Sequence, residues 1–247
     1  MRNIKLVIEY DGKDFNGWQK QPNKLNIQGE IEKVIYSITG EEVNLIASGR
    51  TDAGVHAIGQ VANFKTNSNI PIDKIGLAIN SRLKKSIVIK DVEEVDERFH
   101  SRYLCKQKTY RYIINNSKYG TAIYRNLEYH FPVKLNVNDM KKAIKFFEGE
   151  HDFKAFKASG TSSKSSVRTI FNTNLYEKDD RIYIELTGNG FLYNMVRIIS
   201  GTLLEVGLGK IRPYQIKEII ESKDRENAGR TLPSQGLYLV RVEYDEK

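Results

Sequence analysis

Alternation of apolar and polar residues predicts strands in both halves of the chain. Near the N-terminus, Ile4, Leu6, Ile8 and Tyr10 alternate with polar neighbours, which is the period-two pattern of a half-buried strand. Similar or short apolar runs predict further strands at 43–47, 61–64, 87–92, 108–115, 170–176, 181–187 and 237–244. The turn-forming pair Asp179-Asp180 separates two of these runs and therefore predicts a hairpin.

Apolar residues spaced three or four apart predict helices between these strands. The first helix would begin after a capping Asn26, bury a face of isoleucines and valine between residues 27 and 38, and end at Gly40. Further stripes predict helices at 72–79, 137–147 and 192–206, and Pro213 suits the first turn of another. The segment Ser159 to Ser166 is rich in glycine, serine and threonine and is predicted to be a loop, with no function assigned.

The order of these elements predicts the fold class. Residues 1–100 read β-α-β-β-α-β, which is the ferredoxin-like pattern, and residues 101–247 repeat the order without obvious sequence similarity. We therefore predict an α+β protein. Its two ferredoxin-like (RRM-like) halves, 1–100 and 101–247, would form an extended central antiparallel sheet with a cleft between them.

Composition narrows the class of protein. The single cysteine, Cys105, excludes an internal disulfide framework and any zinc site with several cysteines. The four histidines show no close metal-ligand spacing, so a cofactor-poor protein is the default expectation. The N-terminus lacks the apolar core of a signal peptide, and no apolar run approaches the roughly 20 residues of a membrane helix. A soluble cytoplasmic protein is the expectation.

Positive charge is concentrated in one window. The net charge is +8, and no Asp or Glu occurs from Arg98 to Leu127. This window holds seven cations, Arg98, Arg102, Lys106, Lys108, Arg111, Lys118 and Arg125, interleaved with tyrosines that include Tyr103, Tyr110, Tyr112 and Tyr119. Cations suit phosphates and aromatic rings suit bases, so the pattern favours a nucleic-acid partner. The alternative is a solvated basic face with tyrosines in the core.

The stretch from Gly49 to Ala57 carries the candidate for chemistry. It places the carboxylate of Asp52 between Gly49 and Gly54, with Arg50 two residues before it. Asp is already ionised at neutral pH, so as a nucleophile it needs no general base. It needs exclusion of water and a cationic partner. The alternatives are a tight turn with a solvated Asp–Arg pair, or an aspartyl-phosphate site, which usually has a second carboxylate nearby.

Two further segments contain candidate residues. The segment Gly188 to Arg197 opens a predicted helix with Gly-x-Gly but lacks the third glycine of the dinucleotide fingerprint. Arg197 follows in an apolar stretch, where a buried cation would need a carboxylate partner and an exposed one would point to solvent. Tyr110, in a predicted strand, would either fill the core or face a pocket, and spacing leaves both open.

Taken together, the motifs resemble one enzyme family. The string Gly49-Arg50-Thr51-Asp52-Ala53-Gly54-Val55-His56-Ala57 resembles the signature of the tRNA pseudouridine synthase A family. Lys108 to Tyr112 and Gly188 to Arg197 resemble its tyrosine motif and its helix-opening motif. The family's N-terminal pattern is matched by Tyr10-Asp11-Gly12 with Phe15, Gly17, Trp18 and Gln19, and a further motif by Phe147 to Phe153. The resemblance covers essentially the whole chain.

The resemblance implies a cofactor-free isomerase that works as a homodimer on tRNA. Such enzymes convert uridine to pseudouridine at positions 38, 39 and/or 40 of the anticodon stem-loop. Asp52 would be the nucleophile, Arg197 its ion-pair partner and Tyr110 the residue against the target base, while Arg50 would help hold the base out of the stack. The first candidates for contact with the RNA backbone are Arg98, Arg102, Lys106, Lys108 and Arg111.

Two other classes of protein compete with this interpretation. Two ferredoxin-like halves with exposed tyrosines would suit a non-catalytic RNA-binding module similar to tandem RRM domains. The aromatic–basic string of such domains is absent, and a binding module has no use for the Asp52 loop. A phosphotransferase with an aspartate nucleophile is the third possibility, and it predicts dependence on magnesium.

Overall fold

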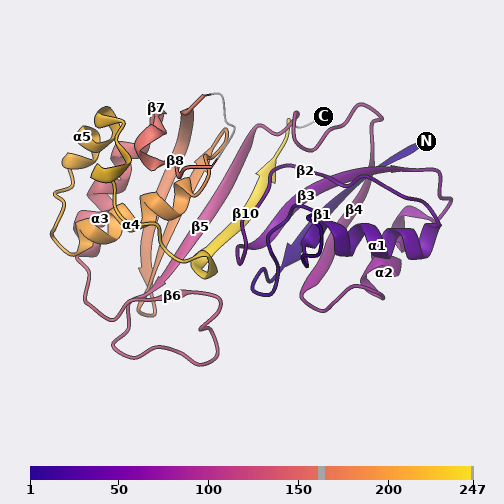
Figure 1. The fold of residues 1–247 in the computed structure, drawn as a ribbon, viewed down its shortest axis with the longest axis horizontal. Coiled ribbons are helices and arrows are strands. Elements are labelled where there is room, and N and C mark those ends of the chain that lie inside the picture. Colours follow the sequence, from indigo (N-terminus) through magenta and orange to yellow (C-terminus); the bar gives the residue numbers. More distant parts are fainter. Residues whose placement is uncertain (161–164, 246–247) are drawn as a thin grey trace. The chain divides into compact units, whose positions relative to one another are not determined.

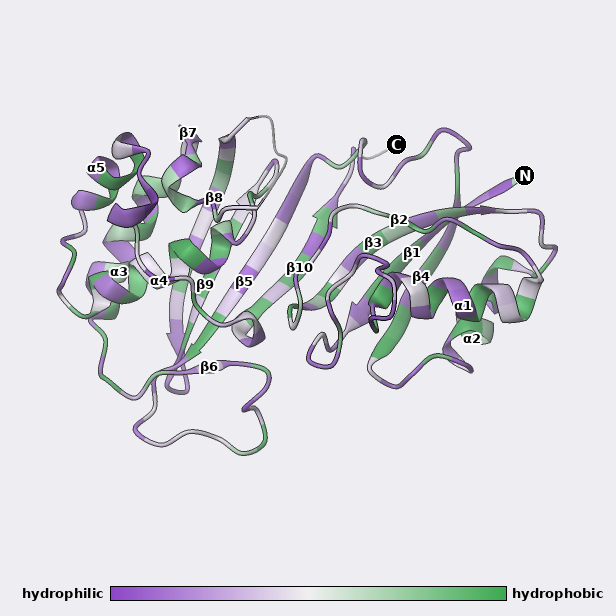
Figure 2. Ribbon diagram, in the orientation of Figure 1, coloured by the Kyte–Doolittle hydropathy of each residue, from purple (hydrophilic) through white to green (hydrophobic). Residues whose placement is uncertain are grey.

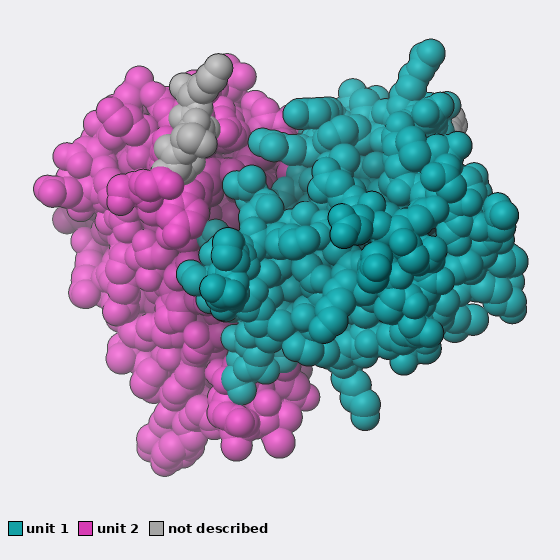
Figure 3. Space-filling model, turned by 45° about the vertical axis from the view of Figure 1, so that its right-hand side comes forward, with its two compact units in different colours: residues 1–106, 238–247 teal, residues 107–237 magenta. Residues whose placement is uncertain are grey.

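The computed structural model describes residues 1–160 and 165–245 and divides the chain into two compact units. Unit 1 consists of residues 1–106 and 238–247, and unit 2 of residues 107–237 (Figure 3). The described residues form ten strands and five α-helices (Figure 1). The predicted α+β class is therefore confirmed.

Unit 1 is built on the first strand of the chain. Its elements are β1 (Arg2–Tyr10), α1 (Ile27–Thr39), β2 (Ile46–Ala47), β3 (His56–Thr66), α2 (Ile72–Asn80), β4 (Ile87–Val95) and most of β10 (Leu237–Glu243). β1 lies between β3 and β4 and is antiparallel to both. The other edge of β3 pairs with β2, antiparallel, and with β10, parallel. From β1 to β4, the order of elements and the antiparallel pairing match the expected ferredoxin-like pattern.

The predicted amphipathic faces form the core of unit 1. Ile4, Leu6 and Ile8 of β1 are completely buried, as are three isoleucines of α1, at positions 27, 31 and 35. Figure 2 shows hydrophobic residues alternating with polar ones along these elements. The Asn26 side chain accepts a hydrogen bond from the Gly29 amide at the start of α1, and Gly40 ends the helix at φ 74°. Both ends of this helix lie where the sequence predicts them.

Unit 2 has a four-stranded antiparallel sheet in the order β5-β9-β8-β7. Its elements are β5 (Gln107–Asn115), β6 (Tyr129–His130), α3 (Val137–Ile144), β7 (Gly149–Asp152), β8 (Val167–Lys178), β9 (Arg181–Gly188), α4 (Met195–Gly207) and α5 (Gln215–Ser222). The short β6 pairs in parallel with β5, and the three helices lie on one side of the sheet (Figure 1). Asp179 and Asp180 both have positive φ in the β8–β9 hairpin, as their turn role requires.

Several element boundaries differ from the predictions, and three of the differences have clear local reasons. The strand expected at 43–47 is only Ile46–Ala47, since pairing with β3 is limited to these two residues. The helix expected from residue 192 begins at Met195 because Asn194, at φ 59°, is left-handed. The stripe at 137–147 is an α-helix only to Ile144 and continues as a 3₁₀ turn, Lys145–Phe147.

The compact units divide the chain differently from the predicted halves. Unit 1 extends to Lys106 rather than to residue 100, and it also takes residues 238–247, which were expected in the second half. Parallel pairing of Tyr238 with His56 and Leu239 with Ala57 joins β10 to unit 1. The Lys106 amide donates to the Glu243 carbonyl at 2.9 Å, which fixes the end of this segment to the same unit.

Two further expectations concern the Ser159–Ser166 loop and membrane-spanning helices. Residues 161–164 of the predicted Ser159–Ser166 loop lie outside the described residues. Within the described ranges, no helix has both the length and the apolar character that crossing a membrane requires.

Candidate active site

The Asp52 loop joins β2 to β3 in unit 1 and is anchored at both of its ends. The side chains of Ser48, Thr51 and Val55 are buried, whereas Asp52 is half-buried and Arg50 is exposed. The Val55 amide donates to the Asp52 carbonyl at 3.1 Å, closing a tight turn. Buried apolar and hydroxyl side chains therefore form the base of the loop, and the charged side chains of Asp52 and Arg50 are its more exposed part.

A second loop, residues 11–18, holds the Asp52 loop in place. The Trp18 amide donates to the Thr51 carbonyl at 3.0 Å, and the Gly54 amide donates to the Phe15 carbonyl at 3.3 Å. Trp18 itself is 2% exposed and contacts Tyr10, with ring centroids 6.1 Å apart. The only tryptophan of the chain is thus a buried support beneath the candidate nucleophile.

Two glycines allow the backbones of loop 11–18 and the Asp52 loop to approach each other this closely. A Cβ at Gly12 would lie 1.9 Å from the Val55 carbonyl oxygen, and a Cβ at Gly17 would lie 2.5 Å from the Thr51 carbonyl oxygen. Gly17 also has φ +82°, a conformation that side chains with a Cβ rarely adopt. The two backbones touch at both points, so the position of Asp52 depends on residues about 40 positions earlier in the chain.

Buried hydrogen bonds fix the base of the loop. The hydroxyls of Tyr10 and Thr51 lie 2.7 Å apart, and burial raises the pKa of Tyr10, so this phenol stays neutral. Ser48 donates to Gln60 Oε1 at 2.7 Å, and Gln60 Nε2 donates to the Gly49 carbonyl at 2.9 Å. Gln60 is completely buried. These bonds satisfy polar groups that would otherwise favour rearrangement of the loop.

Arg197 lies in the first turn of α4 in unit 2, and its guanidinium is held from two sides. Nε donates to the Leu232 carbonyl at 2.7 Å, and Nη1 donates to Asn194 Oδ1 at 2.7 Å. The residue is half-buried. Two hydrogen bonds at different nitrogens fix the plane of the guanidinium, which is unlike a helix residue that simply extends into solvent.

The Leu232 carbonyl belongs to a segment, residues 229–233, that we call the strap. Its Gly229 amide donates to Thr202 Oγ1 of α4 at 2.9 Å. At the other end, Tyr112 of β5 donates its hydroxyl to the Pro233 carbonyl at 2.7 Å. The strap therefore connects the helix that carries Arg197 to a neighbouring strand.

The strap approaches α4 as closely as two backbones can. A Cβ at Gly201 would lie 1.8 Å from the Arg230 carbonyl oxygen. The strap has neither helical nor strand periodicity, so the sequence pattern does not predict it. The only hint lies in the glycines at 201 and 229, which become informative once they are seen to face each other.

Tyr110 lies in the middle of β5 and is 8% exposed. It is opposite Leu186 of β9. Its ring meets Phe191 edge-on, with centroids 5.0 Å apart at 76°. Phe191 comes from the segment Gly188 to Arg197, so two of the recognised motifs contact each other within unit 2.

The predicted catalytic residues are shared between the two units. Asp52 and Arg50 belong to unit 1, whereas Tyr110 and Arg197 belong to unit 2. Within its own unit, the backbone of the Asp52 loop, the guanidinium of Arg197 and the ring of Tyr110 each have defined contacts. The meeting of Asp52 with Arg197 and Tyr110 stays a prediction from the resemblance.

The residues predicted to contact the RNA backbone are also divided between the two units. In unit 1, Arg98, Arg102 and Lys106 are exposed, and Lys106 Nζ lies 2.8 Å from Asp245. In unit 2, Lys108 and Arg111 are half-buried in β5, and Arg111 lies 2.7 Å from Glu185. Because Glu185 already compensates its charge, Arg111 is a weaker candidate for a phosphate than the exposed arginines.

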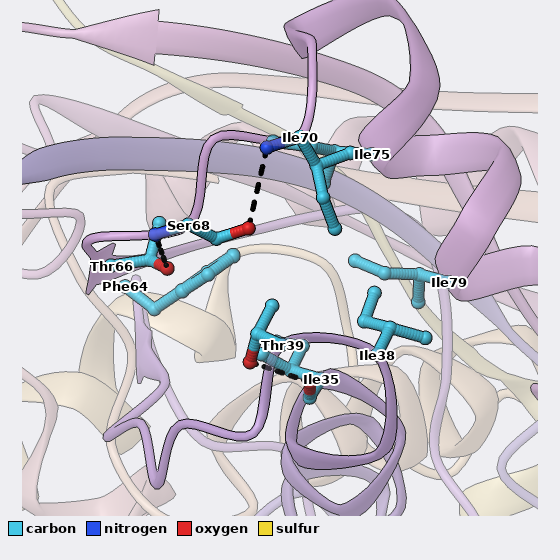
Figure 4. A pocket seen from close by; sticks show the side chains of 9 residues that line it. All are labelled: Ile35, Ile38, Thr39, Phe64, Thr66, Ser68, Ile70, Ile75 and Ile79. Atoms are coloured by element: carbon cyan, nitrogen blue, oxygen red, sulfur yellow. Dashed lines mark hydrogen bonds between the residues drawn. The ribbon is translucent and has the colours of Figure 1, made fainter.

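An apolar hollow in unit 1 is a poor candidate for the reaction. It lies between α1, α2 and the end of β3 (Figure 4). Its lining consists of Ile35, Ile38, Thr39, Phe64, Thr66, Ser68, Ile70, Ile75 and Ile79. None of these side chains is titratable at neutral pH, and Asp52 is not among them. In the described part of the chain, no three or more His, Cys, Asp or Glu side chains gather as they would around a metal.

Comparison with known families finds one match across most of the chain. The model of a family described as tRNA pseudouridine synthase matches residues 6–104 and 143–245. These segments include the Asp52 loop and Arg197. The stretch between them, which carries Lys106, Lys108, Tyr110 and Arg111, is outside the match.

Individual relatives match the whole chain. Proteins named tRNA pseudouridine synthase A from Caldicellulosiruptor saccharolyticus and Acetivibrio thermocellus are 57% and 54% identical over 244 residues, covering 99% of this chain and 100% of each relative. A solved chain from a Cbf5-Nop10-Gar1 complex matches 95% of this chain and 57% of that one, at a TM-score of 0.36 and 14% identity. That likeness is too low to support a fold assignment.

Proposed function

Because the chain belongs to the tRNA pseudouridine synthase family, we propose that it isomerises uridine at positions 38, 39 and/or 40 of the tRNA anticodon stem-loop, with Asp52 as nucleophile. The observation that carries the proposal is the Asp52 loop. Its half-buried carboxylate is presented by a turn that hydrogen bonds to Trp18 and Phe15 of the neighbouring loop hold in place. A site for a covalent or ion-pair step needs this preorganisation.

The reaction breaks the N1–C1′ glycosidic bond, turns the uracil, and joins its C5 to C1′. A stacked uridine cannot undergo these steps, so the nucleotide must first be flipped out at a cost of a few kcal/mol. Asp52 then either attacks C1′ directly or assists loss of the base and shields the sugar. When the C1′–C5 bond has formed, the proton on C5 leaves and the aromatic uracil is restored. Both routes need an ionised carboxylate beside C1′.

Arg197 would keep that carboxylate ionised after tRNA excludes water. Burial disfavours a lone carboxylate charge, and a nearby guanidinium compensates it. Support for this role comes from the two hydrogen bonds of Arg197, to Leu232 and Asn194, which fix its guanidinium at the start of α4.

Tyr110 and Arg50 would act on the uracil. The ring of Tyr110, braced by Phe191, offers a flat surface to the flipped base, and its hydroxyl can take part in removal of the C5 proton. Arg50 is exposed on the Asp52 loop, where a guanidinium can help hold the base out of the stack.

The tRNA would be recognised mainly through shape and phosphates, because a site that serves neighbouring uridines cannot read one sequence tightly. Arg98, Arg102, Lys106, Lys108 and Arg111 are the proposed backbone contacts. The enzyme would act in the cytoplasm as a homodimer, without a metal or another cofactor. The support for the dimer is the family resemblance.

Incubation of the purified protein with unmodified tRNA transcripts tests the proposal. The expected result is pseudouridine at one or more of positions 38–40, formed equally well in the presence of EDTA. Binding of tRNA without pseudouridine would instead identify a non-catalytic RNA-binding module. A requirement for magnesium in the chemical step would favour the phosphotransferase alternative.

A further inference from the structure

Residues 100–103 of unit 1 present an aromatic pair to solvent. Tyr103 is 76% exposed, although exposed rings of this size lose the stabilisation that burial would give. Its ring stacks on His100 with centroids 4.1 Å apart and planes at 28°. The Arg102 guanidinium carbon lies 6.0 Å from the Tyr103 ring centre, within the range of a cation–π contact.

A buried polar network makes this platform rigid. Between the exposed residues, Ser101 is completely buried, and its amide and hydroxyl both donate to Asn63 Oδ1, at 2.9 and 2.7 Å. The Ser101 carbonyl accepts from the Tyr244 hydroxyl at 2.8 Å. Asn3 Nδ2 adds a bond to the Phe99 carbonyl at 2.9 Å. Strands β1, β3 and the chain after β10 thus fix the backbone from which Tyr103 projects.

The orientation of the lower ring is also fixed. His100 Nδ1 lies 3.2 Å from the Arg102 amide and 3.3 Å from the Tyr103 amide and accepts from both. The imidazole therefore caps its own turn and cannot rotate freely. Because Tyr103 is 76% exposed, most of its ring remains accessible to a planar partner.

We propose that Tyr103, backed by His100, is a stacking platform for one unpaired base of the tRNA, with Arg102 on the adjoining phosphate. The inference rests on the proposed function, since it adds a binding residue for the same substrate. The window from Arg98 to Leu127 contains no carboxylate that would repel a polyanion. Stacking on an exposed aromatic ring is tolerant of sequence, as an enzyme for several uridines requires.

Binding of an unmodified tRNA transcript to the full chain, measured over a range of salt concentrations, tests the platform. We expect Tyr103→Ala to weaken binding about tenfold or more at every salt concentration, because one stacked base is lost. The slope of log Kd against log salt should stay unchanged. Arg102→Ala should instead lower that slope by about one, as loss of one phosphate contact does. Tyr103→Phe, which keeps the ring, should bind close to wild type.

The matched control is Tyr36→Ala, which removes another exposed tyrosine of unit 1, 54% exposed on α1. It should leave affinity unchanged. Tyr103→Trp supplies a direct readout, because a base stacked on the indole quenches its fluorescence, whereas Trp18, only 2% exposed, gives a constant background.

Three results would overturn the platform. The first is wild-type affinity of Tyr103→Ala, and the second is the absence of quenching in Tyr103→Trp. The third is a change in the oligomeric state of Tyr103→Ala that accounts for the lost affinity. Any one of them is sufficient. If the wild-type protein forms pseudouridine while Tyr103→Ala binds normally, only the stacking role fails. If the wild-type protein forms no pseudouridine, the proposed function itself fails.

Discussion

At the scale of single residues, the candidate chemistry depends on how two opposite charges are held. Asp52 sits on a turn whose backbone is clamped by Trp18 and Phe15. Arg197 is held by the Leu232 carbonyl and the Asn194 side chain. The backbone that carries Asp52 and the guanidinium of Arg197 are thus each held by hydrogen bonds within their own unit, which lowers the entropy that ordering these groups for reaction would cost.

Replacement of Arg197 tests its role as the partner of the nucleophile. Arg197→Met should lower the rate about 100-fold, the usual effect of removing one preorganised electrostatic partner. It should also cost about 1–3 kcal/mol of stability, since the Leu232 carbonyl loses its donor. Rates at saturating tRNA and urea unfolding separate the two effects. Arg212→Met, which removes an exposed arginine of the same unit, is the control. Near-normal activity of Arg197→Met would remove it from the mechanism.

At the scale of elements, irregular segments rather than helices and strands position the candidate site. The loop 11–18 supports Asp52, and the strap supports Arg197. Both supports depend on contacts between backbones that only glycine allows, at Gly12, Gly17 and Gly201. The regular elements provide the rigid frame to which these segments are attached.

Two glycines with similar backbone conformations test how much the contact between loop 11–18 and the Asp52 loop contributes to stability and activity. Gly17 and Gly40 have φ of +82° and +74°, but only Gly17 meets another backbone, while a Cβ at Gly40 would meet nothing within 4 Å. Gly40→Ala should therefore cost about 1 kcal/mol from backbone strain alone. Gly17→Ala should cost more and also slow pseudouridine formation, because Thr51 must move. Equal effects on stability and unchanged rates for both variants would show that this contact does not position Asp52.

The strap is tested by Tyr112, whose hydroxyl binds the Pro233 carbonyl. Burial holds the pKa of Tyr112 well above its ordinary value, so this phenol donates at any working pH. Tyr112→Phe should lower the free energy of unfolding by about 1 kcal/mol and reduce activity through a looser Arg197. Tyr176→Phe, at a half-exposed position, is the control. Loss of stability without any loss of activity would separate the strap from catalysis.

The sequence was informative about regular elements and uninformative about these supports. Periodicity located β1, α1 and the β8–β9 hairpin because each has a repeating buried face. It overestimated β2, where a short apolar run makes only two pairs. It could not find the strap or explain Trp18, because contacts between residues distant in the chain leave no periodic pattern.

At the scale of the whole molecule, charge and family resemblance predict a tRNA-binding enzyme. The resemblance to the tRNA pseudouridine synthase A family is confirmed by relatives that match over 99% of the chain. The division of the backbone differs from the prediction, since β10 returns to unit 1. The sequence pattern predicts the order of the strands along the chain. It does not predict that β10 pairs with β3, because this pairing depends on tertiary packing.

Binding to tRNA should weaken steeply as salt increases, because phosphate contacts release counterions. The double variant Arg98→Ala/Arg102→Ala should reduce the slope of log Kd against log salt by about two. Lys74→Ala, which removes an exposed lysine of α2, should leave the slope unchanged. Titrations at several salt concentrations measure this directly. Equal slopes for the double variant and the wild type would show that these arginines do not contact the backbone.

Release of tritium from C5-labelled tRNA by the Asp52→Asn variant tests the central claim most directly. Asparagine keeps the size of the side chain and removes its charge, so the loop should stay folded and tRNA binding should be largely retained. We predict no release above background, whereas the wild-type protein releases tritium as each C1′–C5 bond forms. Normal release by Asp52→Asn would contradict the assignment of Asp52 as the nucleophile.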